Sequence, residues 1–105
     1  MLEALKQEVC DANLELVARG LVSLTWGNVS ARDPKTGHVA IKPSGVPYEE
    51  LTPDRIVILS LDGRKLEGTL RPSSDTATHL ELYRTFSGVR GVAHTHSRSE
   101  EHTSE

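Results

Sequence analysis

The chain has 105 residues, enough for one small domain, and its 36% hydrophobic and 26% charged residues are typical of a folded soluble protein. A net charge of −3, without any block of Lys and Arg, argues against nucleic-acid binding, because phosphate neutralisation needs a basic surface. No apolar run is long enough to cross a membrane, and no secretion signal begins the chain. The single cysteine, Cys10, excludes an internal disulfide, so we expect a cytoplasmic protein with Cys10 in its core.

The first half of the chain predicts one helix followed by short extended segments. Apolar residues at three- and four-residue spacing predict a helix over residues 1–19, which Gly20 ends. Pattern and turn residues then predict an extended segment over residues 21–30 and a turn over residues 33–37. A strand over residues 38–42 and a loop or short helix over residues 48–55 follow.

The second half predicts a hairpin, a helix and a last strand. The two strands of the hairpin are predicted over residues 56–61 and 65–68. The helix is predicted over residues 74–86, and the last strand over residues 91–96. Asp62 and Gly63 form a hairpin signal, and Ser74 and Asp75 are both good first residues for the helix. This order predicts an α/β fold with a mostly antiparallel central sheet flanked by helices.

The last eight residues, 98–105, contain no apolar residue, although they follow directly on the predicted last strand. One back-translation of this octapeptide, AGATCGGAAGAGCACACGTCTGAA, reads as a common sequencing-library adapter. We therefore expect residues 98–105 to be a non-native or disordered tail and residues 1–97 to be a truncated domain.

The motif His94-Thr95-His96 is the sharpest local signal of chemistry. Alternate residues of a strand face the same way, so both imidazoles can reach one divalent metal ion. For a motif of this kind taken alone, an exposed or hydrogen-bonded histidine pair is the simpler explanation.

Three breaks rich in small residues are suited to binding an anion. Pro72-Ser73-Ser74-Asp75 precedes the second helix, where backbone N–H groups and two hydroxyls can hold a phosphate. The other two are Trp26-Gly27-Asn28 and Lys42-Pro43-Ser44-Gly45, in which Lys42 adds positive charge. Each has an ordinary explanation, since Asp75 is a good helix N-cap and the other two breaks suit turns. With the two histidines they make a stronger set than any one motif.

These motifs lie in five segments that follow one another along residues 1–97. The segments are Leu24-Thr25-Trp26-Gly27-Asn28-Val29-Ser30, Ile41-Lys42-Pro43-Ser44-Gly45-Val46, Glu67-Gly68, Pro72-Ser73-Ser74-Asp75-Thr76 with Thr78-His79, and His94-Thr95-His96-Ser97. In order and spacing they resemble the L-ribulose-5-phosphate 4-epimerase branch of the class II aldolase/adducin family. Asp75 favours this branch, because related aldolases such as fuculose-phosphate aldolase tend to carry a glutamate there.

The resemblance implies a class II aldolase-like fold and a site for a small-molecule sugar phosphate. It implies that Asp75, His94 and His96 are ligands of zinc or another divalent metal. It also implies substrate contacts from a set of small polar residues, to which Lys42 adds charge: Gly27, Asn28, Ser44, Gly45, Ser73 and Ser74.

The reaction implied is metal-dependent epimerisation at C4, from L-ribulose 5-phosphate to D-xylulose 5-phosphate, by retro-aldol cleavage and re-addition. It would belong to arabinose or related sugar breakdown, in a homotetrameric full-length enzyme. The family's third histidine ligand and acid/base residues match no position here, so we expect the 105-residue product to be inactive. A class II sugar-phosphate aldolase stays an alternative. So does a non-catalytic domain like the adducin head, although the retained metal ligands argue against it.

Overall fold

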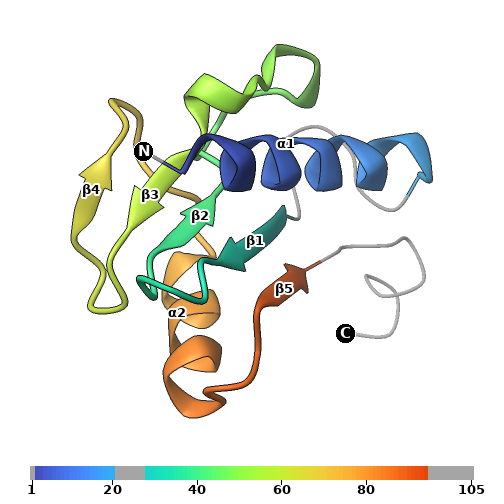
Figure 1. Cartoon of the computed structure of the whole chain (residues 1–105). Helices are drawn as coiled ribbons and strands as arrows, with labels where there is room; N and C mark the ends of the chain where they lie inside the picture. Colours follow the sequence, from blue (N-terminus) through green and yellow to red (C-terminus); the bar gives the residue numbers. More distant parts are fainter. Residues whose placement is uncertain (1, 21–27, 95–105) are drawn as a thin grey trace.

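The computed structural model of the chain describes residues 2–20 and 28–94. Within them a five-stranded sheet carries a helix on each face (Figure 1). The elements in chain order are α1 (Glu3–Ala18), β1 (Asn28–Arg32), β2 (Val39–Ile41), η1 (Tyr48–Glu50), η2 (Pro53–Arg55), β3 (Val57–Leu59), β4 (Lys65–Glu67), α2 (Thr76–Thr85) and β5 (Gly91–His94). None of the helices in this part of the chain is long and apolar enough to span a bilayer.

The sheet has the strand order β4-β3-β2-β1-β5, and each neighbouring pair is antiparallel. The first four strands are neighbours in chain order; short turns join β1 to β2 and β3 to β4, and a longer segment with η1 and η2 joins β2 to β3. After α2 the chain returns to the opposite edge, where β5 pairs with β1 (Figure 1). The predicted α/β class, with a mostly antiparallel sheet flanked by helices, is therefore confirmed.

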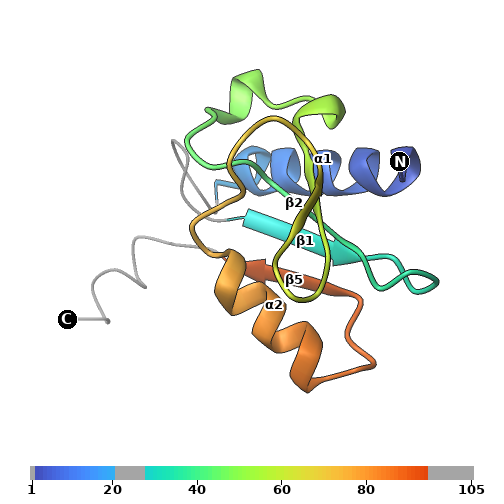
Figure 2. The ribbon, with the colours of Figure 1, turned by 90° about the vertical axis from the view of Figure 1, so that its left-hand side faces the viewer.

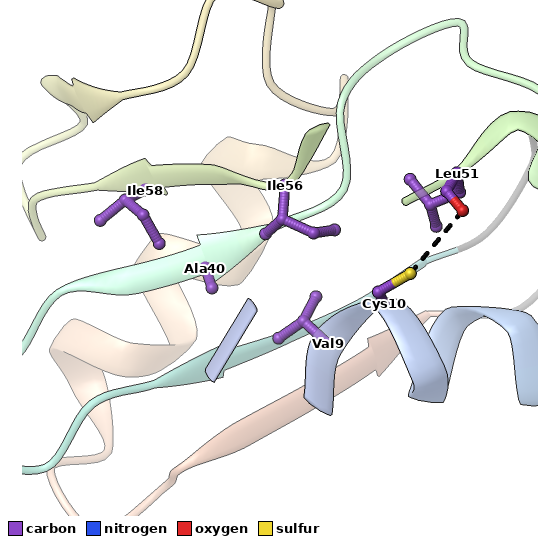
Figure 3. Close-up of a cluster of buried hydrophobic side chains, with 6 residues drawn as sticks. All are labelled: Val9, Cys10, Ala40, Leu51, Ile56 and Ile58. Carbon is purple, nitrogen blue, oxygen red and sulfur yellow. Dashed lines mark hydrogen bonds between the residues drawn. The ribbon is translucent and has the colours of Figure 1, made fainter. Parts of the chain in front are cut away.

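The helix α1 covers one face of the sheet. Its apolar face contributes two of the six buried side chains of a cluster, which Figure 3 shows: Val9, Cys10, Ala40, Leu51, Ile56 and Ile58. Cys10 is 2% exposed, and its Sγ lies 3.8 Å from the carbonyl oxygen of Leu51. Cys10 is thus a core residue, as its place on the apolar face predicts.

The helix α2 covers the opposite face, so that the sheet lies between the two helices (Figure 2). Here Leu80 and Tyr83 pack on inward-facing residues of β2 and β3, which are Val39, Ile41, Val57 and Leu59. Because both faces are covered, β2 and β3 are apolar without a break, and each buried aliphatic side chain contributes about 1.5–3 kcal/mol.

The described elements differ from the predicted ones mainly at their ends. The strand predicted over residues 56–61 stops at Leu59, because the hairpin turn already begins at Ser60, whose backbone N–H donates to the carbonyl oxygen of Arg64. The loop over residues 48–55 forms the short 3-10 helices η1 and η2. Gly20 ends α1 with a φ of 70°, as predicted. Predicted features of residues 21–27, 95–96 and the tail 98–105 lie outside the described residues.

Candidate active site

Ser73 holds the turn that leads into α2, and Asp75 does not cap the helix with its side chain. Asp75 stands at the N-cap position, but its carboxylate makes no capping hydrogen bond. The Oγ of Ser73 accepts a hydrogen bond from the backbone N–H of Asp75 over 3.1 Å. The carbonyl oxygen of Ser73 accepts from the hydroxyl of Thr76 over 2.6 Å. The simplest explanation of Asp75 from the sequence, capping by its carboxylate, is therefore wrong.

The carboxylate of Asp75 instead meets Asn28, the first residue of β1. The Nδ2 of Asn28 donates to Oδ2 of Asp75 over 3.2 Å and to Oγ of Ser73 over 2.8 Å. Asn28 is fully buried, and its Oδ1 meets no hydrogen-bond donor among the described residues. A buried amide oxygen left unsatisfied costs about 1–3 kcal/mol, which is tolerated most readily where a ligand can supply the donor or cation. Two of the three predicted anion-binding breaks thus meet here.

The third break joins them through Lys42, directly after β2. Its carbonyl oxygen accepts a hydrogen bond from the backbone N–H of Ser73 over 2.9 Å. The side chain of Lys42 is 2% exposed, and its Nζ lies 4.5 Å from the centroid of the Tyr48 ring. Burial lowers the pKa of Lys42 to about 8, while the Asp75 carboxylate acts to raise it. Burial strengthens the attraction between an ammonium and an anionic ligand, because the effective dielectric constant is lower there than in water.

Tyr48 is a site residue that the sequence analysis missed. Burial, followed by the charge of Asp75, raises the pKa of Tyr48 to about 12, so its hydroxyl stays protonated at neutral pH. Its ring faces the ammonium of Lys42, an arrangement that stabilises a cation by about 0.5–2 kcal/mol. The only signal for it in the sequence is an aromatic residue in the loop that follows Lys42.

Three small residues of these breaks, Ser44, Gly45 and Ser74, are exposed and lie on the segments around Lys42 and Ser73. The backbone N–H of Ser44 donates to the carbonyl oxygen of Arg71 over 2.7 Å, and a bridge pairs Pro43 with Pro72. Gly45 has a φ of 74°, a conformation that favours glycine. Ser44, Gly45 and Ser74 are therefore available to a ligand next to the buried groups.

The backbone of β5 brings His94 to the same end of the sheet. In the β1–β5 ladder His94 is the register partner of Asn28, the residue that contacts Asp75. The side chain of His94, and all of His96 and Gly27, lie outside what the structure describes. Within residues 2–20 and 28–94 no cluster of three metal-ligating side chains is found, so the metal centre stays a prediction.

Solved structures share this fold, in which an antiparallel sheet lies between two helices. L-fuculose 1-phosphate aldolase matches with a TM-score of 0.85 and 33% identity, over 90% of this chain and 45% of that chain. The l-fuculose-1-phosphate aldolase of Thermus thermophilus matches with a TM-score of 0.69 and 35% identity, over 90% of this chain and 47% of that chain.

Residues 7–100 match the model of the Class II Aldolase and Adducin N-terminal domain, and the chain belongs to this family. It is 55% identical over 96 residues to L-ribulose-5-phosphate 4-epimerase UlaF of Salmonella paratyphi B and of Salmonella paratyphi A. The match covers 91% of this chain but 42% of those relatives, so the chain spans less than half of their length.

Proposed function

We propose that the chain is the N-terminal part, residues 1–97, of an enzyme that epimerises L-ribulose 5-phosphate to D-xylulose 5-phosphate at C4. The 55% identity to the epimerases named UlaF supports this function over that of a fuculose-phosphate aldolase, for which the identities are 33% and 35%. The observation that carries it is the contact of Asn28 with both Ser73 and Asp75, which joins the phosphate-suited break to the metal-suited carboxylate. The residues beyond 97 are proposed to be foreign to the enzyme.

The substrate phosphate binds where the three breaks meet. Lys42 supplies the positive charge, and its pKa of about 8 keeps it protonated at neutral pH. Ser44, Gly45 and Ser74 are exposed on the two segments that contain Lys42 and Ser73. The proposed phosphate contacts beside Lys42 are Gly27, Asn28, Ser44, Gly45, Ser73 and Ser74. Holding the phosphate keeps the cleaved aldehyde fragment in place, which makes its re-addition effectively unimolecular.

Asp75, His94 and His96 are proposed to hold zinc or another divalent metal, on which the class II aldolase family typically depends. One carboxylate and two imidazoles suit zinc, and the register of β5 supports the set, since His94 pairs with the residue that contacts Asp75. When bound, the metal supplies Lewis-acid polarisation of the substrate carbonyl. Asn28 orients the carboxylate of Asp75 by donating to one of its oxygens, as outer-shell groups do for metal ligands.

The acid/base residues, the third histidine ligand and the homotetramer belong in this proposal to the rest of the enzyme. The 105-residue chain alone therefore has no epimerase activity. A cytoplasmic role in arabinose or related sugar breakdown completes the proposal.

Resequencing the source DNA past the Ser97 codon tests the proposal first. We expect a longer reading frame in place of residues 98–105, and genomic sequence that encodes this tail would contradict the assignment of residues 98–105. The recovered enzyme should then convert L-ribulose 5-phosphate to D-xylulose 5-phosphate in a coupled assay, and Lys42→Met should lose most of this activity. Cleavage of L-fuculose 1-phosphate without epimerisation would support the aldolase instead, a candidate favoured by the TM-score of 0.85.

A further inference from the structure

We propose that the buried network of Ser30, His79 and Tyr83 is a positioning device, which sets how α2 lies on β1 and thereby holds Asp75 against Asn28. Its consequence for metal binding rests on the function proposed above.

Two rows of polar residues face each other across the boundary between β1 and α2. One row takes every second residue of β1, on one face of the strand, and consists of Asn28, Ser30 and Arg32. The other takes every fourth residue from the N-cap of α2, on one side of the helix, and consists of Asp75, His79 and Tyr83. The rows match in order, so each contact between them fixes the same register of helix on strand.

The middle contact is made by Ser30, which is fully buried. Its Oγ lies 2.6 Å from Nδ1 of His79 and 2.7 Å from the hydroxyl of Tyr83. His79 is 0% exposed and Tyr83 is 1% exposed, so water cannot easily replace either contact. Ser30 has one proton and can donate to only one of the two, so the other must donate to Ser30. The contact therefore demands a specific arrangement of donors and acceptors as well as close packing.

The last contact ties the C-terminal end of α2 to the same strand. The Nη1 of Arg32 donates to the carbonyl oxygen of Tyr83 over 3.0 Å, and its guanidinium lies 5.3 Å from the centroid of the Tyr83 ring. A second nitrogen of Arg32 donates to the carbonyl oxygen of Val89 over 2.6 Å, in the segment that leads to β5. The helix is thus held at both ends, with Ser30 between them.

The apolar contacts of α2 favour the same helix face but are less specific than the hydrogen bonds. Leu80 and the Tyr83 ring pack on aliphatic residues of β2 and β3, and such contacts are not directional. A shift of one residue along an α-helix turns the contacting face by about 100°. Such a turn would carry Asp75 away from Asn28 and Leu80 away from the sheet, so the apolar contacts and the hydrogen bonds of Ser30 oppose it together.

The first test observes the geometry directly in the 105-residue chain. NMR follows the side-chain amide protons of Asn28, through their exchange with water and their Overhauser contacts with Ser73. In His79→Leu we expect exchange at least about tenfold faster, since a buried hydrogen bond is lost. His79→Asn, whose amide can replace Nδ1, should restore slow exchange. The control Ile58→Val loosens the core on the α1 side and should leave the Asn28 amide unchanged.

The second test uses the full-length enzyme and measures zinc affinity by competition with a chelator, together with kcat and KM. We expect His79→Leu to weaken zinc binding about 10- to 100-fold and to lower kcat more than it raises KM. His79→Asn should recover most of both, and Ile58→Val should change neither. Tyr83→Phe, which removes one hydroxyl, should give a smaller change of the same kind and keeps the test decisive if His79→Leu does not fold.

The outcomes separate the two proposals. An unchanged Asn28 amide in folded His79→Leu overturns the positioning role, and so does normal zinc affinity with normal kcat. Equal losses in Ile58→Val and His79→Leu also overturn it, because they would show a general loss of stability. If the Asn28 amide responds as expected but the wild-type enzyme neither binds zinc nor epimerises, the positioning of Asp75 stands and the proposed function fails.

Discussion

The side-chain amide of Asn28 donates a hydrogen bond to the carboxylate of Asp75, with 3.2 Å between Nδ2 and Oδ2. The same nitrogen lies 2.8 Å from Oγ of Ser73, so one buried side chain joins β1 to the start of α2. The backbone of Asn28 pairs on its other side with His94 of β5. Asn28 therefore lies between the carboxylate and the strand that carries the predicted histidine ligands.

Replacing Asn28 tests whether this amide is needed to hold the carboxylate. Asn28→Asp places a second carboxylate beside Asp75, so we expect it to destabilise the chain by about 3–5 kcal/mol at neutral pH. Asn28→Ala removes the donor without adding charge and should cost less, about 1–3 kcal/mol. Urea unfolding of both variants measures the difference, which should shrink at acidic pH as one carboxyl takes up a proton. An Asn28→Asp variant as stable as Asn28→Ala would show that the two side chains do not share a buried site.

The charge of Lys42 makes phosphate binding depend on pH. Its pKa in the folded chain is about 8, so the ammonium loses its proton as pH rises through that value. We expect the affinity for inorganic phosphate, measured by calorimetry, to fall above about pH 8. Lys42→Met should bind phosphate weakly at every pH, and the exposed Lys35→Met should behave as the wild type. A wild-type affinity that stays constant across this range would contradict the role of Lys42.

The same group predicts the direction in which stability changes. Lys42 in the unfolded chain keeps its ordinary pKa of 10.5, so between about 8 and 10.5 the unfolded state binds more protons than the folded state. The free energy of unfolding should therefore gain a contribution from Lys42 as pH rises through this window. Lys42→Met lacks that contribution, and the difference between its stability and that of the wild type should change in this window alone.

Ser73 and Ser74 are adjacent hydroxyls for which the structure predicts different roles. The Oγ of Ser73 accepts from the backbone N–H of Asp75 and from Asn28, so Ser73→Ala should lower stability by about 1–3 kcal/mol and also weaken phosphate binding. Ser74 is exposed, and Ser74→Ala should weaken phosphate binding while changing stability by less than about 0.5 kcal/mol. Thermal unfolding and phosphate titration of both variants check this. Equal losses of stability in Ser73→Ala and Ser74→Ala would show that both hydroxyls stabilise the start of α2.

Much of the fold could be predicted from the sequence because its elements are local and strongly patterned. Apolar spacing predicts the helix over residues 1–19. Glycine predicts the end of this helix, the next turn and the hairpin, because Gly20, Gly37 and Gly63 all adopt positive φ. Strand ends were less predictable. Leu61 fits a strand by composition, but the hydrogen bond between Ser60 and Arg64 ends β3 two residues earlier.

The site was predictable where a motif names its residues, and unpredictable where only the tertiary fold brings them together. Asn28, Lys42, Ser73 and Asp75 came from three separate breaks, and nothing local says that they meet. Tyr48 lies in the long connection between β2 and β3 and joins the candidate site only because η1 places its ring against Lys42. The Ser30–His79–Tyr83 network depends on helix-to-strand register, which no short pattern encodes.

The proposed metal makes a last prediction, for the full-length enzyme. Dialysis against a chelator should abolish epimerase activity, and added zinc should restore it. Asp75→Asn keeps the shape of the ligand but removes its charge, so we expect zinc affinity to fall at least about tenfold and activity with it. His94→Ala and His96→Ala should lose zinc as well, as measured by metal content after dialysis.

The matched control for Asp75→Asn is Asp62→Asn, in the exposed hairpin that joins β3 to β4. The pKa of Asp62 is lowered mainly by a hydrogen bond from Ser60, so this substitution also removes a charged, hydrogen-bonded carboxylate. Because the hairpin is not part of the proposed site, Asp62→Asn should keep full zinc content and activity. If Asp75→Asn retained zinc as well as Asp62→Asn does, the carboxylate beside Asn28 would not be a metal ligand. Its contact with Asn28 would then have a structural role alone.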